Sequence, residues 1–161
     1  MSDARPKSAL TVREVDAFVA AHPEQWQTWA RFLAFTGLRV SEAAGLRVAH
    51  VDLTRRRVTV TEAVVVVNGR KIEQTRVKTD TSQGRRVPLV AELVELLDPL
   101  VHGRAPTERL FVLRGGTTVN RANYSRRQFR AAITAVGHPE MQPHELRHTA
   151  CLLYTSPSPR D

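Results

Sequence analysis

The chain has 161 residues, 42% of them hydrophobic and 25% charged, a balance that predicts one folded domain and excludes a wholly disordered chain. No apolar run approaches the ~20 residues that span a bilayer, and the single cysteine, Cys151, excludes a disulfide framework and a thiolate-rich zinc site. We therefore expect a cytoplasmic protein without a membrane partner, whose net charge of +8 favours an anionic partner, most commonly nucleic acid.

The N-terminal part of the chain predicts two helices. Residues 1–10 are polar and irregular, so we interpret them as a linker or as the end of a preceding segment. Thr11 and Glu14 have the spacing of a capping box, which predicts a helix through about Ala21. A second helix, 24–36, carries its aromatic side chains at core spacing.

A glycine and a serine mark the predicted end of the second helix and the start of a third. Gly37 suits the end of the second helix because it tolerates a positive φ. Ser41 is expected to cap a short third helix that ends at Ala44.

The middle of the chain is predicted to form strands. Residues 58–67 are rich in Val and Thr, Asn68-Gly69 is a strong hairpin signal, and residues 71–77 alternate on the far side. Residues 85–89 return as a short strand, which completes a three-stranded antiparallel sheet.

The remainder is predicted to be mainly helical, which makes the fold class α+β. The predicted elements are a helix over 91–101, a short strand over 110–113, a helix from Asn120 or Asn123 to Val136, and a last helix from about Pro143.

Residues 151–161, which read CLLYTSPSPRD, differ in character from the rest. Their codons can be written as the adapter used in transposase-based sequencing libraries, so we interpret them as a non-native tail after Ala150 and expect the last helix to stop there. The alternative is a natural Pro/Ser-rich tail.

Three segments resemble the catalytic domain of tyrosine recombinases, the phage-integrase family. Residues 35–42 read FTGLRVSE, residues 77–79 read VKT ahead of RVPL at 86–89, and residues 143–149 read PHELRHT. The resemblance covers residues 11–150 and implies a partial catalytic domain of this fold.

The resemblance implies site-specific recombination of double-stranded DNA through a 3′-phosphotyrosyl intermediate. Arg39 and Arg147 would hold the phosphate oxygens with always-charged guanidinium groups. Lys78 occupies the place of the general acid that protonates the leaving 5′-oxygen, and His144 that of the histidine which helps to move the proton of the nucleophile. No metal and no cofactor are implied.

Other charged residues are given supporting roles. Glu42, one turn after Arg39, would orient it, and His148 would be structural. A further set is expected either to contact DNA phosphates or to form solvated surface: Arg85, Arg86, Arg126, Arg127 and Arg130.

The nucleophilic tyrosine of the family has no counterpart in this chain. Tyr154 is only seven residues after Arg147 and lies in the suspected tail, while Tyr124 precedes the third segment and is expected to pack in the core. We therefore expect a fragment that cleaves nothing, from a parent that acts as a homotetramer on DNA.

Three alternatives remain open. His144, Glu145 and His148 also match the H-E-x-x-H motif of zinc proteases. Residues 41–46 could open a helix-turn-helix in a DNA-binding module without enzymatic activity. A type IB topoisomerase would use the same active-site chemistry.

Overall fold

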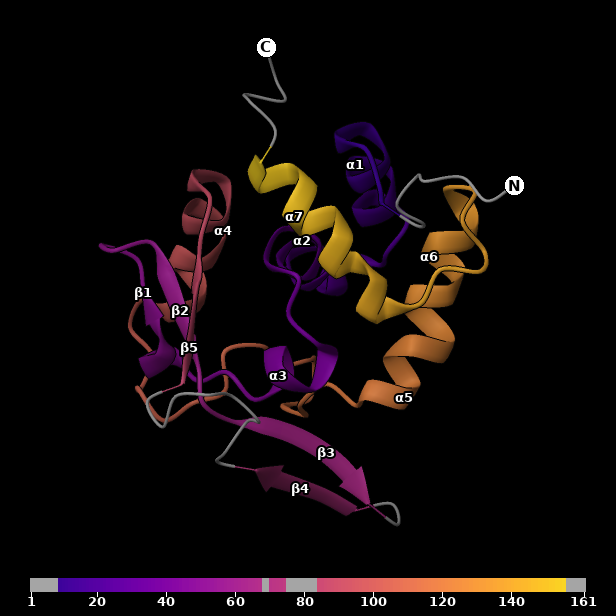
Figure 1. The fold of residues 1–161 in the computed structure, drawn as a ribbon. Helices are drawn as coiled ribbons and strands as arrows, with labels where there is room; N and C mark the ends of the chain where they lie inside the picture. The colour runs from indigo at the N-terminus through magenta and orange to yellow at the C-terminus, as the bar shows by residue number, and fades with distance from the viewer. Residues whose placement is uncertain (1–8, 68–69, 75–83, 156–161) are drawn as a thin grey trace.

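Helices from both halves of the chain surround one central helix, in a computed structural model that describes residues 9–67, 70–74 and 84–155 (Figure 1). This central helix, α2 (Gln27–Thr36), contacts α1 (Val12–Ala20), α4 (Ala91–Val101) and α7 (Leu146–Thr155). Most of α2 is buried on all sides, as is typical of a helix in the middle of a core.

The predicted N-terminal helices are confirmed with small changes at their ends. The Thr11 hydroxyl accepts the Glu14 N–H at 3.1 Å and the Glu14 carboxylate accepts the Thr11 N–H at 2.9 Å, so both bonds of the capping box form. The second helix begins as a 3-10 turn, Glu24–Trp26, before α2. Gly37 ends α2 in the left-handed conformation, with φ of 70°.

The third helix, α3 (Val40–Ala44), begins two residues earlier than predicted. Arg39 rather than Ser41 occupies the capping position, and the Glu42 carboxylate accepts the Arg39 N–H at 3.1 Å. The expected Ser41 cap is therefore wrong: the carboxylate in the first turn satisfies the free N–H group instead.

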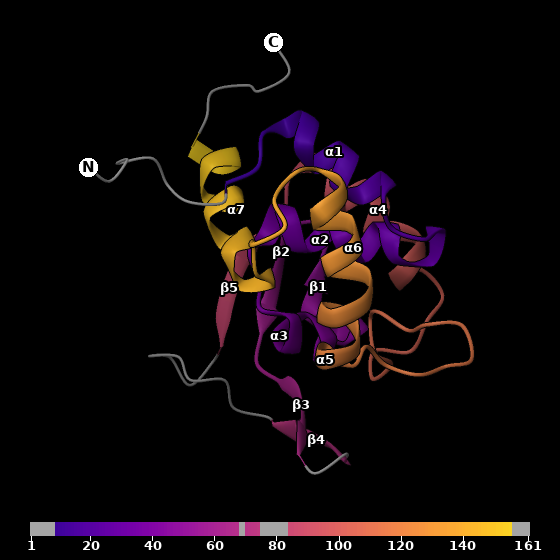
Figure 2. The ribbon, with the colours of Figure 1, turned by 90° about the vertical axis from the view of Figure 1, so that its right-hand side faces the viewer.

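The three-stranded antiparallel sheet is confirmed, but its strands differ from the predicted ones. Its order is β1 (Val51–Asp52), β2 (Arg57–Val60) and β5 (Arg85–Pro88). The predicted strand 58–67 is divided after Val60, and its second part, β3 (Ala63–Val67), pairs with β4 (Arg70–Gln74) in a separate two-stranded sheet. Figures 1 and 2 show this separate hairpin projecting away from the helices.

Close packing explains why the strand divides. A side chain at Gly45 would lie 2.7 Å from the Glu62 carbonyl oxygen, so α3 touches the backbone at the division. Glu62 is also held by ion pairs with Arg47 at 3.0 Å and Arg109 at 3.3 Å. These contacts join residues distant in sequence.

The C-terminal part folds as one interrupted helix and one continuous helix. α5 (Arg121–Asn123), a π-helical segment (Tyr124–Phe129) and α6 (Arg130–Ala135) follow one another, and a 3-10 turn (Pro143–Glu145) leads into α7. The predicted strand 110–113 is reduced to isolated bridges, Arg47 with Arg109 and Val112 with Thr118.

The expectation that the last helix stops at Ala150 is wrong. α7 continues through Thr155, five residues into the suspected tail. Leu146 and Ala150 are buried and Leu153 packs against the core, so the helical spacing of apolar residues continues across the predicted boundary.

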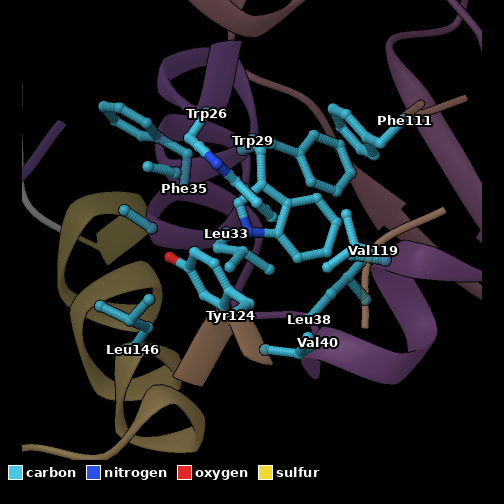
Figure 3. Close-up of a cluster of buried hydrophobic side chains, with 14 of the residues drawn as sticks. Trp26, Trp29, Leu33, Phe35, Leu38, Val40, Phe111, Val119, Tyr124 and Leu146 are labelled. Carbon is cyan, nitrogen blue, oxygen red and sulfur yellow. The ribbon is translucent and has the colours of Figure 1, made fainter. Parts of the chain in front are cut away.

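The core consists of aromatic and aliphatic side chains between α2 and the C-terminal helices. Figure 3 shows Tyr124 among Trp26, Trp29 and Leu33. Tyr124 stacks on Trp26, with ring centroids 5.2 Å apart, and meets Trp29 edge-on at 5.5 Å.

The N-terminal segment is attached to the last helix. The Leu10 N–H donates to the buried Thr149 hydroxyl of α7 at 2.9 Å. This bond joins two points that lie 139 residues apart in the chain.

Candidate active site

A pocket of about 900 Å³ opens where α3, α5 and α7 meet. Figure 1 shows the start of α7 lying above α3 and α5. The pocket is lined by Gly37, Arg39, Val40, Ser41, Arg121, Ala122, Ser125, Arg126, Gln142, Pro143, His144, Arg147 and His148.

Arg39 enters this pocket from the junction of α2 and α3. The left-handed turn at Gly37 redirects the chain, and the next residue, Leu38, is buried and anchors it. The Arg39 side chain is exposed and, within the described part of the chain, forms no hydrogen bond or ion pair. The described residues therefore leave its guanidinium open to a ligand.

His144, Arg147 and His148 come from the beginning of the last helix. Pro143 opens the 3-10 turn, and the Glu145 carboxylate accepts the Gln142 N–H at 3.2 Å, which fixes this beginning. The three pocket side chains are exposed, whereas the alternating positions Leu146 and Thr149 are buried. The polar face of an amphipathic segment thus forms this wall.

Gly37 brings the first and third sequence segments into contact. A Cβ at this position would lie 3.2 Å from the Arg147 Cα and 3.1 Å from the Ala150 Cβ. The absence of a side chain at Gly37 allows its backbone to approach α7 closely. Arg39 and Arg147, 108 positions apart in the numbering, therefore line one pocket.

The third wall contains residues that the sequence analysis missed. Arg121 and Ser125 line the pocket beside the predicted Arg126. Arg121 and Ser125 are four residues apart, as are Ala122 and Arg126, and residues four apart lie on the same face of a helix. This shared face brings Arg121 and Arg126 to the same wall, but no local pattern in the sequence shows that α3 and α7 pack beside it.

The pocket is strongly cationic. Four arginines and two histidines line it, and no lining residue among those described is acidic. Since guanidinium groups stay protonated at all physiological pH values, the pocket suits a phosphate or another oxyanion.

The remaining predicted residues lie elsewhere. Lys78 and the side chain of Tyr154 fall outside the part that the structure describes. Glu42 is buried and accepts from the Arg85 guanidinium, with the closer N–O distance at 2.9 Å. Three further arginines are exposed and lie outside the pocket lining: Arg86, Arg127 and Arg130.

A model of the phage integrase family matches residues 9–156. The chain belongs to the phage integrase family. The putative prophage phiRv2 integrase of Mycobacterium tuberculosis strain H37Rv is 27% identical over 152 residues, which are 91% of this chain and 40% of that protein. The chain thus spans two fifths of the length of this curated relative.

Solved structures of integrases and recombinases share the fold. The Tn1549 transposon integrase in complex with transposon right-end DNA superposes with a TM-score of 0.73 at 22% identity, covering 99% of this chain and 57% of that one. The XerA recombinase gives 0.66 at 20% identity, covering 96% and 51%. A lambda integrase dimer bound to a COC′ core site gives 0.57 at 19% identity, covering 95% and 42%. The phage integrase chain therefore has the tyrosine recombinase catalytic-domain fold.

Tyr124 of this integrase is confirmed as a packing residue. It is completely buried, and its hydroxyl donates to the His22 ring at 3.0 Å. Burial raises the pKa of Tyr124 far above its ordinary value of 10.0, which keeps the phenol neutral and removes its nucleophilic form.

The geometry also bears on two alternatives. His144 and His148 share the pocket, but among the described residues no three His, Cys, Asp or Glu side chains form a group that could hold a metal. The segment after α3 forms a 3-10 turn, Val48–His50, and then β1, where a helix-turn-helix requires a recognition helix. Across the described ranges, no helix is long and apolar enough to cross a membrane.

Proposed function

We propose that this chain is part of the catalytic domain of a site-specific recombinase whose full-length form integrates or exchanges double-stranded DNA through a 3′-phosphotyrosyl intermediate. Membership of the phage integrase family supports the proposal. The observation that carries it is the cationic pocket, where Arg39, His144 and Arg147 converge from opposite ends of the chain.

Phosphodiester chemistry accounts for the residue types. The phosphate is already an anion, and the pentavalent transition state carries more negative charge on its equatorial oxygens. Arg39 and Arg147 would stabilise those oxygens through charge-assisted bonds. Preorganised donors of this kind contribute roughly 3–4 kcal/mol each to transition-state stabilisation.

Two proton transfers complete the proposed reaction. The tyrosine oxygen bonds to phosphorus, and His144 assists removal of its proton. The bond to the 5′-oxygen breaks, and Lys78 donates the proton that this oxygen needs. The nucleophilic tyrosine is supplied by a part of the full-length protein other than this chain, so the chain itself cleaves nothing.

The proposed partner is double-stranded DNA, bound in the cytoplasm by a homotetramer of the full-length protein. Arg126 would contact phosphate from within the pocket. Arg86, Arg127 and Arg130 are exposed and would add phosphate contacts that position the duplex without reading its sequence.

The decisive experiment traps the covalent intermediate. In the full-length protein, Arg39→Ala or Arg147→Ala should abolish covalent attachment to a nicked suicide DNA substrate, because each removes a donor to the phosphate. Arg31→Gln is the matched control, since Arg31 pairs with Asp16 and Glu92 and does not line the pocket. Wild-type trapping by either alanine variant would refute the proposed function.

A further inference from the structure

Arg85 faces the interior of the molecule although it is a charged residue at the start of an edge strand. It pairs with Val60 of β2, and residues directly opposite in an antiparallel pair share one face of the sheet. Val60 is completely buried, so this is the core-facing side. The neighbouring Arg86 points to the opposite, exposed side.

The Arg85 guanidinium holds the Glu42 carboxylate with both of its terminal nitrogens. One nitrogen lies 2.9 Å from Glu42 Oε1 and the other 3.4 Å from Oε2. The Glu42 side chain is only 3% exposed and that of Arg85 33%. A carboxylate so deeply buried needs its cation, because a buried charge without a partner is strongly unfavourable.

The same carboxylate fixes the position of the Arg39 backbone. Glu42 Oε1 accepts the Arg39 N–H at 3.1 Å as well as the Arg85 guanidinium. Arg85, Glu42 and Arg39 therefore form a chain of hydrogen bonds that runs from β5 to the wall of the pocket.

The entry into β5 is itself fixed. Gly84 has φ of 90°, and a Cβ there would lie 2.6 Å from the Thr61 side chain and 2.7 Å from the Val60 carbonyl oxygen. The backbone before Arg85 thus fits against β2 where only glycine can be placed.

We propose that Arg85 is a positioning residue for Arg39: through the Glu42 carboxylate it holds the backbone that directs the Arg39 guanidinium into the phosphate pocket. This role replaces the direct DNA contact expected from the sequence, and it rests on the proposed function of the pocket. When Arg85 is lost, Glu42 keeps a buried charge without its cation, and the Arg39 N–H loses its fixed acceptor.

A double-mutant cycle on the 161-residue chain tests the proposal. Binding of a fluorescent 30-base-pair duplex is measured by anisotropy at one low salt concentration for wild type, Arg39→Ala, Arg85→Gln and the double variant. A hydrogen bond to a charged group contributes about tenfold to binding affinity. Each single variant should therefore bind the duplex about tenfold more weakly than wild type, and the double variant should bind no more weakly than either single variant. Additive losses would show that Arg85 contacts DNA itself and would overturn the proposal.

Two further variants separate positioning from general loss of structure. Arg31→Gln removes an ion-paired arginine of the same charge outside the pocket and should leave duplex affinity unchanged. Arg85→Lys keeps the positive charge but loses the two parallel N–H donors of the guanidinium. It should therefore bind the duplex more tightly than Arg85→Gln but less tightly than wild type. Equal losses in Arg31→Gln and Arg85→Gln would overturn the proposal.

A measurement without DNA keeps the two proposals distinguishable. In the amide NMR spectrum of the free chain, Arg85→Gln should shift the Arg39 signal and Arg31→Gln should leave it in place. If the Arg39 signal shifts but Arg39→Ala leaves duplex binding intact, the positioning role stands and the proposed function of the pocket fails. An Arg39 signal that does not move in Arg85→Gln overturns the positioning role.

Discussion

His22 and Tyr124 form a polar pair inside an aromatic core. The His22 Nδ1 lies 2.8 Å from the Phe18 carbonyl oxygen, which can only accept, so this nitrogen donates and Nε2 accepts from the Tyr124 hydroxyl at 3.0 Å. His22 is 3% exposed, and its burial lowers its pKa from the ordinary value of 6.5. Folding therefore favours the neutral imidazole.

The pair predicts how stability depends on pH. Because the His22 pKa is lower in the folded than in the unfolded state, its contribution is complete above pH 6.5 and is lost as the pH falls below that value. His50, whose pKa is also lowered mainly by burial, acts in the same direction. The free energy of unfolding, measured by urea denaturation between about pH 5 and pH 7, should decrease toward acidic pH. This decrease should be smaller in His22→Gln.

Removal of one oxygen tests the hydrogen bond itself. Tyr124→Phe leaves the His22 Nε2 acceptor without its donor and should lower the free energy of unfolding by about 1–3 kcal/mol, measured by urea denaturation at pH 7. Phe129, which packs against the same ring at 6.2 Å, remains in place in this variant. A stability equal to wild type would mean that the hydroxyl has no structural role.

At the scale of elements, the junction of α2 and α3 against α7 determines the site. Gly37→Ala combines a left-handed alanine with a Cβ 3.2 Å from the Arg147 Cα, so it should lose about 1–2 kcal/mol of stability and also weaken duplex binding. Gly137→Ala is the matched control, because Gly137 has φ of 90° and a Cβ there would meet no atom of the described residues within 4 Å. If Gly37→Ala and Gly137→Ala bind the duplex equally well at a temperature where both are folded, the role of this contact is contradicted.

The elements also show what the sequence can predict. The capping box at Thr11 and the hairpin of β3 and β4 depend on neighbours in the chain, and both are confirmed. The division of the strand after Val60 depends on Gly45 and Glu62 meeting across the fold, which no local pattern encodes.

The site shows the same limit. Its motif residues Arg39, His144 and Arg147 are identified by resemblance, and the structure brings them into one pocket. Arg121 escapes sequence analysis because the other walls of its pocket come from α3 and α7, and no local pattern of the sequence shows that these elements meet there. The roles of these residues in catalysis stay predictions.

At the scale of the whole molecule, charge governs association with DNA. With a net charge of +8 and four arginines in the pocket, the logarithm of the duplex association constant should fall with the logarithm of salt concentration at a slope of about −0.9 for each phosphate contacted. Titrations at several salt concentrations between low and physiological measure this slope. Salt-independent affinity would contradict the phosphate-binding surface.

The hydrogen bond from Leu10 to Thr149 has a practical consequence for shortened versions of the protein. Thr149 is completely buried, two positions after Arg147, so its hydroxyl depends on the lead-in to α1 for a donor. Trimming up to residue 8 preserves that backbone N–H. A version that starts at Leu10 turns it into a charged amino group at a buried position, and one that starts at Thr11 removes it and leaves the Thr149 hydroxyl without this donor. The minimal unit for ligand-binding studies therefore starts at Ala9 or earlier.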